Sequence, residues 1–250
     1  MRGVFIQDGL EFRLEVTGDD FFQGNAVPCL VSVKSHSDSS RTLSDLRLYL
    51  ALGNLKKVRA KAQDSFDLIS CAEYPPTVEL AAGEQKSFSW NFQLDQNCAI
   101  SDKNQSPYLL YGNSSDASAV GQLPLTVQIH PYIQAIFGTL ETVFQFVLKG
   151  NSSKGGWTTT KFKPPTARRF SFVEELNLSC HFDNEALQLK YLFNVKKFNS
   201  TEVGVNVTKG KTEVEQRYEA SQYLFAGKFV NQEFLEGSIN DALAVVSSGL

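Results

Sequence analysis

The sequence lacks a hydrophobic run long enough to cross a membrane. No stretch reaches the roughly 18 uncharged apolar residues that a membrane-spanning helix needs, and polar residues interrupt the best candidate, 133–148. The first eight residues also contain no apolar run of the length found in signal peptides. We therefore expect a cytoplasmic protein.

Neither sign of charge is in large excess, and the cysteines are few and scattered. The chain has 24 basic and 27 acidic residues and a formal net charge of -3, which argues against a nucleic-acid partner, because binding to polyanions depends on excess positive charge. Cys29, Cys71, Cys98 and Cys180 form no Cys-x-x-Cys pair. We expect reduced thiols, with Cys29 and Cys180 packed as small hydrophobic residues.

The motifs of the common enzyme classes are absent as well. There is no Gly-x-Ser-x-Gly elbow, Walker loop, Rossmann glycine fingerprint or His-Glu-x-x-His helix. The three histidines, His36, His130 and His181, are isolated, and the adjacent carboxylates Asp19-Asp20 and Glu174-Glu175 would point to opposite faces of a strand. We predict no catalytic residue, no cofactor and no metal ligand, and hence a protein that is not an enzyme.

What the sequence does contain is a repeated alternation of bulky apolar and mostly polar residues. This period of two is typical of half-buried strands in antiparallel sheets with one solvated face. The clearest segments are 27–33, 46–52, 88–94 and 187–195. Many short strands of this kind predict a mainly β fold, made of two immunoglobulin-like antiparallel β-sandwich units.

One segment, 131–148, has the 3.6-residue period of an amphipathic helix instead. Pro131 suits the first turn of a helix and Gly150 suits its end. The apolar stripe of this helix must cover either the end of its own sandwich or a partner subunit, so a second copy of the chain is one candidate partner. The stripe contains Ile133, Ile136, Phe137, Leu140, Val143, Phe144 and Val147.

The segment Asn151–Gly156 (Asn-Ser-Ser-Lys-Gly-Gly) has the composition of a flexible linker. It predicts two domains, an N-terminal β-sandwich over 1–150 that ends in the helix and a smaller β-sandwich unit over 151–250. Within the second, 231–246 has a weak helical pattern.

A single strongly basic cluster, formed by Lys56, Lys57, Arg59 and Lys61, follows the apolar segment 46–52. Such a cluster can guard the edge of a sheet against unwanted pairing, or dock an acidic protein or an anionic lipid head group. Together with Phe137 and Phe144 of the helical stripe, these four residues are the candidate partner-binding residues, and peripheral contact with a membrane stays open.

The order of these segments resembles the N-terminal domain of the arrestin-like superfamily. The residues that carry the resemblance are the turn Asp19–Gly24 before a strand, and Ala81-Ala82-Gly83-Glu84 before the aromatic strand 88–94. The helix after His130-Pro131, followed by a short second β unit, is similar to the bacterial sporulation-control protein (Spo0M-like) family. The resemblance implies a non-enzymatic adaptor or regulator that binds a protein partner.

A different class of function is also compatible with the sequence. Trp90, Trp157, Tyr108 and Tyr111 could stack on sugars, and several Asn-x-Ser/Thr sequons would suit a secreted protein. The alternative is therefore an extracytoplasmic carbohydrate-binding or adhesion module.

Overall fold

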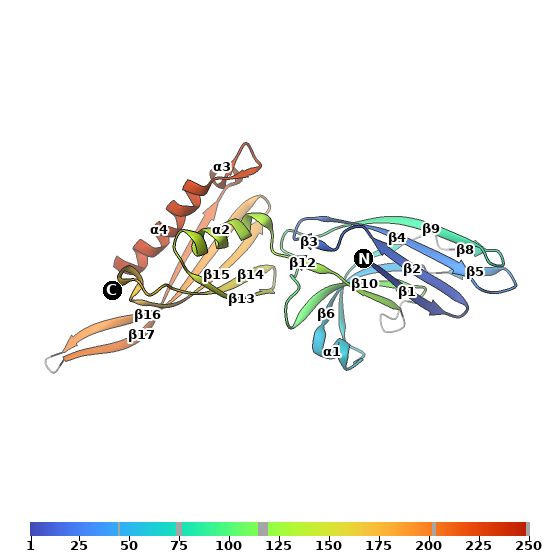
Figure 1. Cartoon of the computed structure of the whole chain (residues 1–250), viewed down its shortest axis with the longest axis horizontal. Helices are drawn as coiled ribbons and strands as arrows, with labels where there is room; N and C mark the ends of the chain where they lie inside the picture. The colour runs from blue at the N-terminus through green and yellow to red at the C-terminus, as the bar shows by residue number, and fades with distance from the viewer. Residues whose placement is uncertain (45, 74–76, 115–119, 202–203, 249–250) are drawn as a thin grey trace. The chain divides into compact units, whose positions relative to one another are not determined.

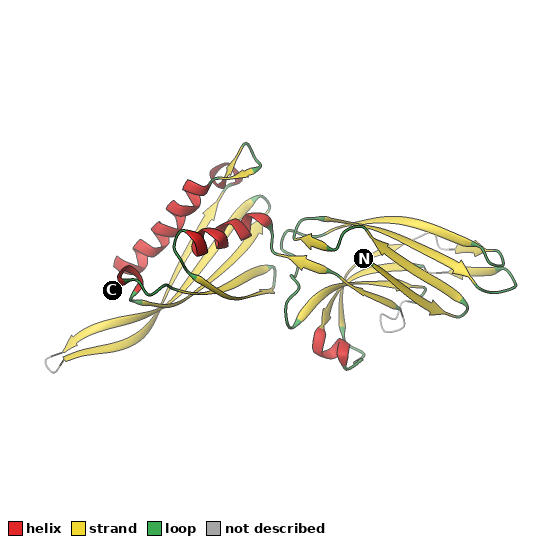
Figure 2. Ribbon diagram, in the orientation of Figure 1, coloured by secondary structure: helices red, strands yellow, loops and turns green. Residues whose placement is uncertain are grey.

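The computed structural model describes residues 1–44, 46–73, 77–114, 120–201 and 204–248. These residues form two compact units, Met1–Gln128 and Ile129–Leu250 (Figure 1). Strands dominate both units (Figure 2), and the pairs within the larger sheets are antiparallel. The prediction of a mainly β fold built from antiparallel sheets is confirmed.

The first unit is a β-sandwich of two four-stranded sheets. The first sheet has the strand order β1 (Arg2–Gln7), β2 (Leu10–Val16), β4 (Ala26–Ser35), β9 (Gln85–Gln93). The second has the order β11 (Gly121–Pro124), β10 (Gln105–Gly112), β6 (Arg47–Asn54), β7 (Phe66–Glu73).

Shorter elements complete this unit. The strand β3 (Asp20–Phe22) pairs in parallel with β12 (Thr126–Gln128), and β5 (Arg41–Ser44) pairs antiparallel with β8 (Thr77–Leu80). A short helix, α1 (Leu55–Arg59), joins β6 to β7.

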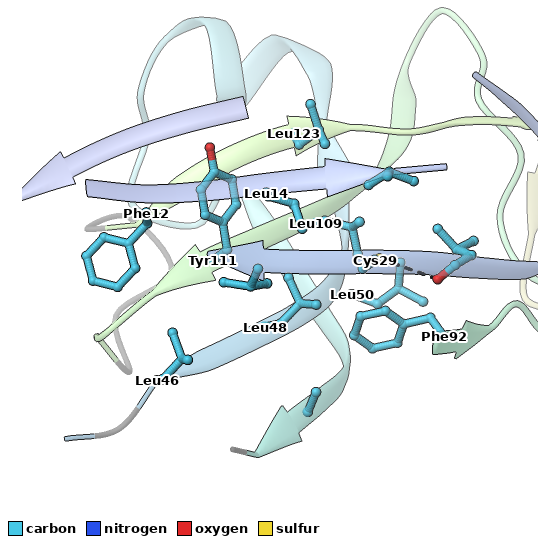
Figure 3. Close-up of a cluster of buried hydrophobic side chains, with 14 of the residues drawn as sticks. Phe12, Leu14, Cys29, Leu46, Leu48, Leu50, Phe92, Leu109, Tyr111 and Leu123 are labelled. Atoms are coloured by element: carbon cyan, nitrogen blue, oxygen red, sulfur yellow. Dashed lines mark hydrogen bonds between the residues drawn. The ribbon is translucent and has the colours of Figure 1, made fainter. Parts of the chain in front are cut away.

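The alternating residues of the two sheets meet in one core (Figure 3). Phe12 and Leu14 of β2 face Leu48 of β6 and Leu109 of β10, and all four side chains are buried. A one-residue slip of any of these strands would turn its apolar set toward solvent, so the burial fixes the register.

The second unit contains one antiparallel sheet of five strands. Their order follows the sequence: β13 (Val147–Lys154), β14 (Trp157–Lys163), β15 (Val173–Asp183), β16 (Ala186–Thr201) and β17 (Gly204–Tyr218). The unit also contains the 3₁₀ turn η1 (Arg168–Phe170), helices α2 (Pro131–Thr142), α3 (Ala220–Tyr223) and α4 (Gln232–Ser248), and the hairpin of β18 (Leu224–Phe225) and β19 (Phe229–Val230).

Helices α2 and α4, and not a second sheet, cover the apolar face of this five-stranded sheet (Figure 1). The rings of Phe137 on α2 and Phe162 on β14 pack edge to face, with centroids 5.6 Å apart. On α4, the Ser238 hydroxyl donates to Oε1 of Gln216 on β17 at 2.8 Å. The amide of Gln232 on α4 donates to the hydroxyl of Thr139 on α2 at 3.0 Å, so the two helices are also joined to each other.

The division between the units therefore lies at 128/129 and not at the predicted 150. The reason is that α2 packs on the second sheet. The predicted linker Asn151–Gly156 is instead part of the β13–β14 hairpin. Gly155 (φ 57°) and Gly156 (φ 78°) form its two-residue turn, because both central positions of such a turn need positive φ.

Helix α2 also ends at Thr142, earlier than the predicted residue 148. Gln145 adopts a left-handed conformation (φ 60°) that reverses the chain into β13, and Val143 and Val147 are exposed. Phe137 and Phe144 are only 3% and 2% exposed. Their side chains belong to the core of the second unit, and so they do not offer a surface to a partner.

We expect Phe137→Ala to lower the free energy of unfolding of the second unit by about 3–5 kcal/mol, because it removes a buried ring from a packed core. Val143→Ala, at the exposed end of the same helix, should change it by less than about 1 kcal/mol. Urea unfolding monitored by circular dichroism measures both values. Equal, small effects would show that Phe137 does not lie in the core.

Candidate partner-binding site

The strand β7 is the outermost strand of its sheet and pairs with β6. An edge strand carries backbone N–H and C=O groups with no partner on its outer side. All side chains from Asp67 to Cys71 are exposed, and therefore no element in the described part of the chain covers this stretch.

A β-bulge places two apolar side chains in this exposed stretch. Ser70 pairs with Leu50 and Leu68 pairs with Ala51, so that Ile69 is an extra residue on β7. The bulge interrupts the alternation, and Leu68 and Ile69 are 52% and 53% exposed. Their exposure makes β7 an apolar edge as well as an unpaired one.

The basic cluster predicted from the sequence lies on α1 and in the turn after it, before β7 in the chain. Asn54 begins this helix, because its side-chain Oδ1 accepts hydrogen bonds from the N–H groups of Lys56 (3.1 Å) and Lys57 (3.2 Å). Leu55 and Val58 of α1 pack against a small second cluster on the outer face of the sheet, which includes Tyr49 and Tyr108.

This arrangement leaves the charged side chains of α1 and its end in solvent. Lys56, Lys57, Arg59 and Lys61 are all exposed. Lys57 forms an ion pair with Asp64, and this lysine holds the pKa of the Asp64 carboxyl below its ordinary value. The other three cations form no ion pair within the described residues.

We call these two features together the β7–α1 surface: the outer edge of β7 at Leu68 and Ile69, and the cations Lys56, Lys57, Arg59 and Lys61 on α1 and in the turn after it. The sequence pattern identified the four cations. It did not identify Leu68 and Ile69, because their exposure depends on the bulge. The only local signal was the pair of adjacent large aliphatic residues before Ser70-Cys71.

The histidines lie in three separate environments. His36 pairs with Glu11 (Nε2–Oε2 3.0 Å), and His181 contacts the carbonyl oxygen of Gly156 through Nδ1 at 2.9 Å. Nδ1 of His130 accepts the N–H of Tyr132 at 3.2 Å and so caps α2, and burial lowers the pKa of His130 to about 4. Among the described residues, no group of three His, Cys, Asp or Glu side chains is placed to hold a metal ion.

The four cysteines are free thiols. Cys29 and Cys180 are buried, as predicted, and burial raises the pKa of the Cys29 thiol to about 12. A thiol with such a pKa is protonated at neutral pH and is a poor nucleophile.

The aromatic residues considered for sugar stacking do not form one platform. Tyr108 and Tyr111 are buried. Trp157 stacks on His181 (centroids 5.0 Å apart), and the Nζ of Lys190 lies 5.0 Å from the Trp157 ring centroid. The Trp157 ring therefore already packs against side chains of its own sheet. In addition, no helix among the described residues is long and apolar enough to cross a membrane.

Comparison with solved structures finds a match over almost the whole chain. Spo0M, a sporulation control protein from Bacillus subtilis, matches with a TM-score of 0.67 and 15% sequence identity, over 95% of this chain and 99% of that chain. The chain has a Spo0M-like fold. The sequence matches no protein-family model and no curated protein.

Other solved structures match only about half of this chain. A β-glucosidase from Listeria innocua matches with a TM-score of 0.31 and 16% identity, over 48% of this chain and 16% of that chain. The DNA glycosylase AlkC from Pseudomonas fluorescens matches with a TM-score of 0.30 and 11% identity, over 49% of this chain and 31% of that chain. Similarity this low says nothing about activity.

We expect His130 to make the second unit less stable in mild acid. Its pKa is about 4 in the folded protein and about 6.5 in an unfolded chain, so the unfolded state binds a proton first as the pH falls. The stabilisation is complete above pH 6.5 and is lost between pH 6.5 and 4. Because the ring is partly exposed, we expect a loss of about 1 kcal/mol between pH 7 and pH 5.

The variant His130→Asn tests this expectation, because asparagine also caps helices but does not titrate. Urea unfolding at pH 7 and pH 5 should show a smaller loss of stability in H130N than in the wild type. Gln134→Ala, an exposed substitution on the same helix that leaves His130 in place, serves as the matched control and should lose as much stability between the two pH values as the wild type. Equal losses in the wild type and H130N would contradict the assignment.

Proposed function

We propose that this protein is a non-enzymatic regulatory adaptor of the cytoplasm, which acts by binding a protein partner at the β7–α1 surface. The observation that carries the proposal is the uncovered edge of β7, with Leu68 and Ile69 exposed beside the basic helix α1. The Spo0M-like fold supports a regulatory role.

Strand addition is the mode of binding that this surface favours. An extended peptide that aligns with β7 satisfies the outer backbone groups of the strand and covers Leu68 and Ile69. Full burial of a large aliphatic side chain contributes about 1.5–3 kcal/mol. Because Leu68 and Ile69 are 52% and 53% exposed, a partner that covers what remains gains about half of this from each. Hydrogen bonds to the backbone then supply affinity without demanding one particular sequence.

The charge of α1 indicates the chemistry of the partner. Lys56, Arg59 and Lys61 belong to the helix and turn that precede the N-terminal end of β7, and Asp64 is already paired with Lys57. These positive charges attract a segment that has acidic side chains at that end. We therefore propose that the partner docks an extended segment that combines aliphatic residues with a run of Asp or Glu.

Two other edges are less suited to strand addition. β17, the edge of the five-stranded sheet, presents exposed Glu213, Glu215 and Arg217, and charges of this kind discourage edge pairing. The edge strand β1 lies close to β11, since a Cβ atom at Gly121 would be 2.7 Å from the Cβ of Phe5.

A photo-crosslinking amino acid at position 68 tests the proposed docking site in the cells that make the protein. We expect a defined crosslinked protein from position 68 and none from position 4, because Val4 is equally exposed (54%) but lies on β1. The same crosslinked protein obtained from both positions would contradict the assignment to β7.

Two pairs of variants test the chemistry of the site once the crosslinked partner has been identified by mass spectrometry. Leu68→Lys with Ile69→Lys should weaken its binding at least tenfold, whereas Val4→Lys with Ile6→Lys, which also replaces two exposed aliphatic residues, should not. Lys56→Glu with Lys61→Glu should weaken binding and reduce its dependence on salt. Unchanged affinity in both the L68K/I69K and the K56E/K61E variants would overturn the proposal.

A further inference from the structure

A second candidate site lies in the second unit, far along the chain from the β7–α1 surface. A hollow of about 570 Å³ is lined by Lys163 at the end of β14, by 164–168, Phe170 and Ser171 of the connection to β15, and by Val173, Glu174 and Lys196. A second hollow of about 470 Å³ shares Glu174 with it and is lined further by Glu175, Asn194, Lys209, Gly210 and Lys211.

The loop that lines the first hollow is held in one conformation. Pro164 and Pro165 restrict its backbone. Phe170 is buried and packs edge to face on Phe146, with ring centroids 5.2 Å apart. The guanidinium of Arg169 lies over the Phe170 ring at 4.4 Å. The loop is thus anchored before any ligand arrives, which lowers the entropic cost of binding.

The strand β16 brings a further cation to the hollow. The N–H of Lys196 donates to the carbonyl oxygen of Phe172 at 2.8 Å, which fixes this part of β16 beside the loop. Lys196 therefore lines the same hollow as Lys163 and Arg168, although it lies about thirty residues away in the sequence.

The balance of charge in the first hollow is positive. Lys163, Arg168 and Lys196 face a single carboxylate, Glu174, which leaves an excess of two positive charges. Glu174 lies between two ammonium groups, with Oε1 3.9 Å from Nζ of Lys196 and Oε2 3.5 Å from Nζ of Lys209. Lys163 and Arg168 make no ion pair in the described part of the chain.

The neighbouring carboxylate does not compete for these cations. Glu175 pairs with Lys161 (Oε2–Nζ 2.5 Å) and accepts hydrogen bonds from the side-chain amides of Asn177 and Asn194. Lys161 and the two amides hold the pKa of Glu175 below its ordinary value. The free cations of the first hollow therefore remain available to a ligand.

We propose that this hollow binds a phosphate group. The guanidinium of Arg168 can donate two parallel hydrogen bonds to phosphate oxygens, and the ammonium of Lys163 supplies a second charge. The hydroxyls of Thr166 and Ser171, which also line the hollow, add neutral donors. Two excess positive charges match the roughly two negative charges of a phosphate monoester better than the single charge of a carboxylate.

A phosphate group could reach the hollow on a soluble compound or on a lipid head group, and the chemistry of recognition is the same for both. The site is separate from the β7–α1 surface. Absence of phosphate binding would not contradict the proposed adaptor function. Absence of a partner at the β7–α1 surface would not contradict the phosphate site.

Isothermal titration of the full chain with inorganic phosphate, and sedimentation with vesicles of phosphatidylcholine with or without phosphatidic acid, test the proposal. Binding to inorganic phosphate alone would indicate a soluble ligand, and binding to the phosphatidic acid vesicles would indicate a lipid head group. Either result supports the proposal if the double substitution Lys163→Gln with Arg168→Gln weakens binding to that probe at least tenfold. Absence of binding to both probes would overturn it.

Two further variants distinguish phosphate binding in this hollow from general attraction of phosphate to a basic surface. Lys149→Gln with Lys228→Gln removes the same charge from exposed positions of the second unit that line neither hollow, and should leave phosphate binding unchanged. Glu174→Gln removes the only carboxylate lining the first hollow and should tighten binding about threefold. Equal weakening by K149Q/K228Q, or weaker binding by E174Q, would contradict the placement of the phosphate in this hollow.

Discussion

A strand at the edge of a sheet must leave its outer backbone groups to water or to another strand, and this constraint governs what the surface of this protein can do. The sheets are open, so edges exist in both units. On β17 charged side chains guard the edge, and β1 lies beside β11. On β7 the edge is uncovered, and a bulge adds exposed Leu68 and Ile69. The proposed adaptor function follows from this uncovered strand edge and from the cations of the preceding helix and turn.

The two units cover the apolar faces of their sheets in different ways. In the first unit, Phe12 and Leu14 of one sheet pack on Leu48 and Leu109 of the other. In the second, α2 and α4 supply the layer that packs on the five-stranded sheet. The polar face of the five-stranded sheet is tied together by its own side chains, such as Lys190 with Glu215. The apolar side chains that pack between the layers therefore form the cores of both units. The candidate sites lie at the edge of β7 and at the loop between β14 and β15.

Strands, helix starts and clusters of neighbouring residues could be predicted from the sequence. Contacts between residues that are far apart in the sequence could not. The apolar alternation at 27–33 and 88–94 identified β4 and β9, because a period of two matches the alternating faces of a strand and not the 3.6-residue turn of a helix. His130-Pro131 marked the start of α2. Its end was missed, because the apolar stripe continues past Gln145, whose left-handed conformation only the packed structure shows. Lys56 to Lys61 are neighbours in sequence and could be grouped, whereas Lys163, Arg168 and Lys196 meet only when β16 is placed beside the loop.

Amide hydrogen exchange on the complex with the partner crosslinked at position 68 tests strand addition at β7 most directly. In the free protein, the outer amides of an edge strand exchange rapidly because no hydrogen bond protects them. Our account predicts that exchange within 67–71 slows when the partner binds, while exchange in β1 and β17 stays unchanged. Unaltered exchange in β7, with new protection on a different strand or helix, would contradict it.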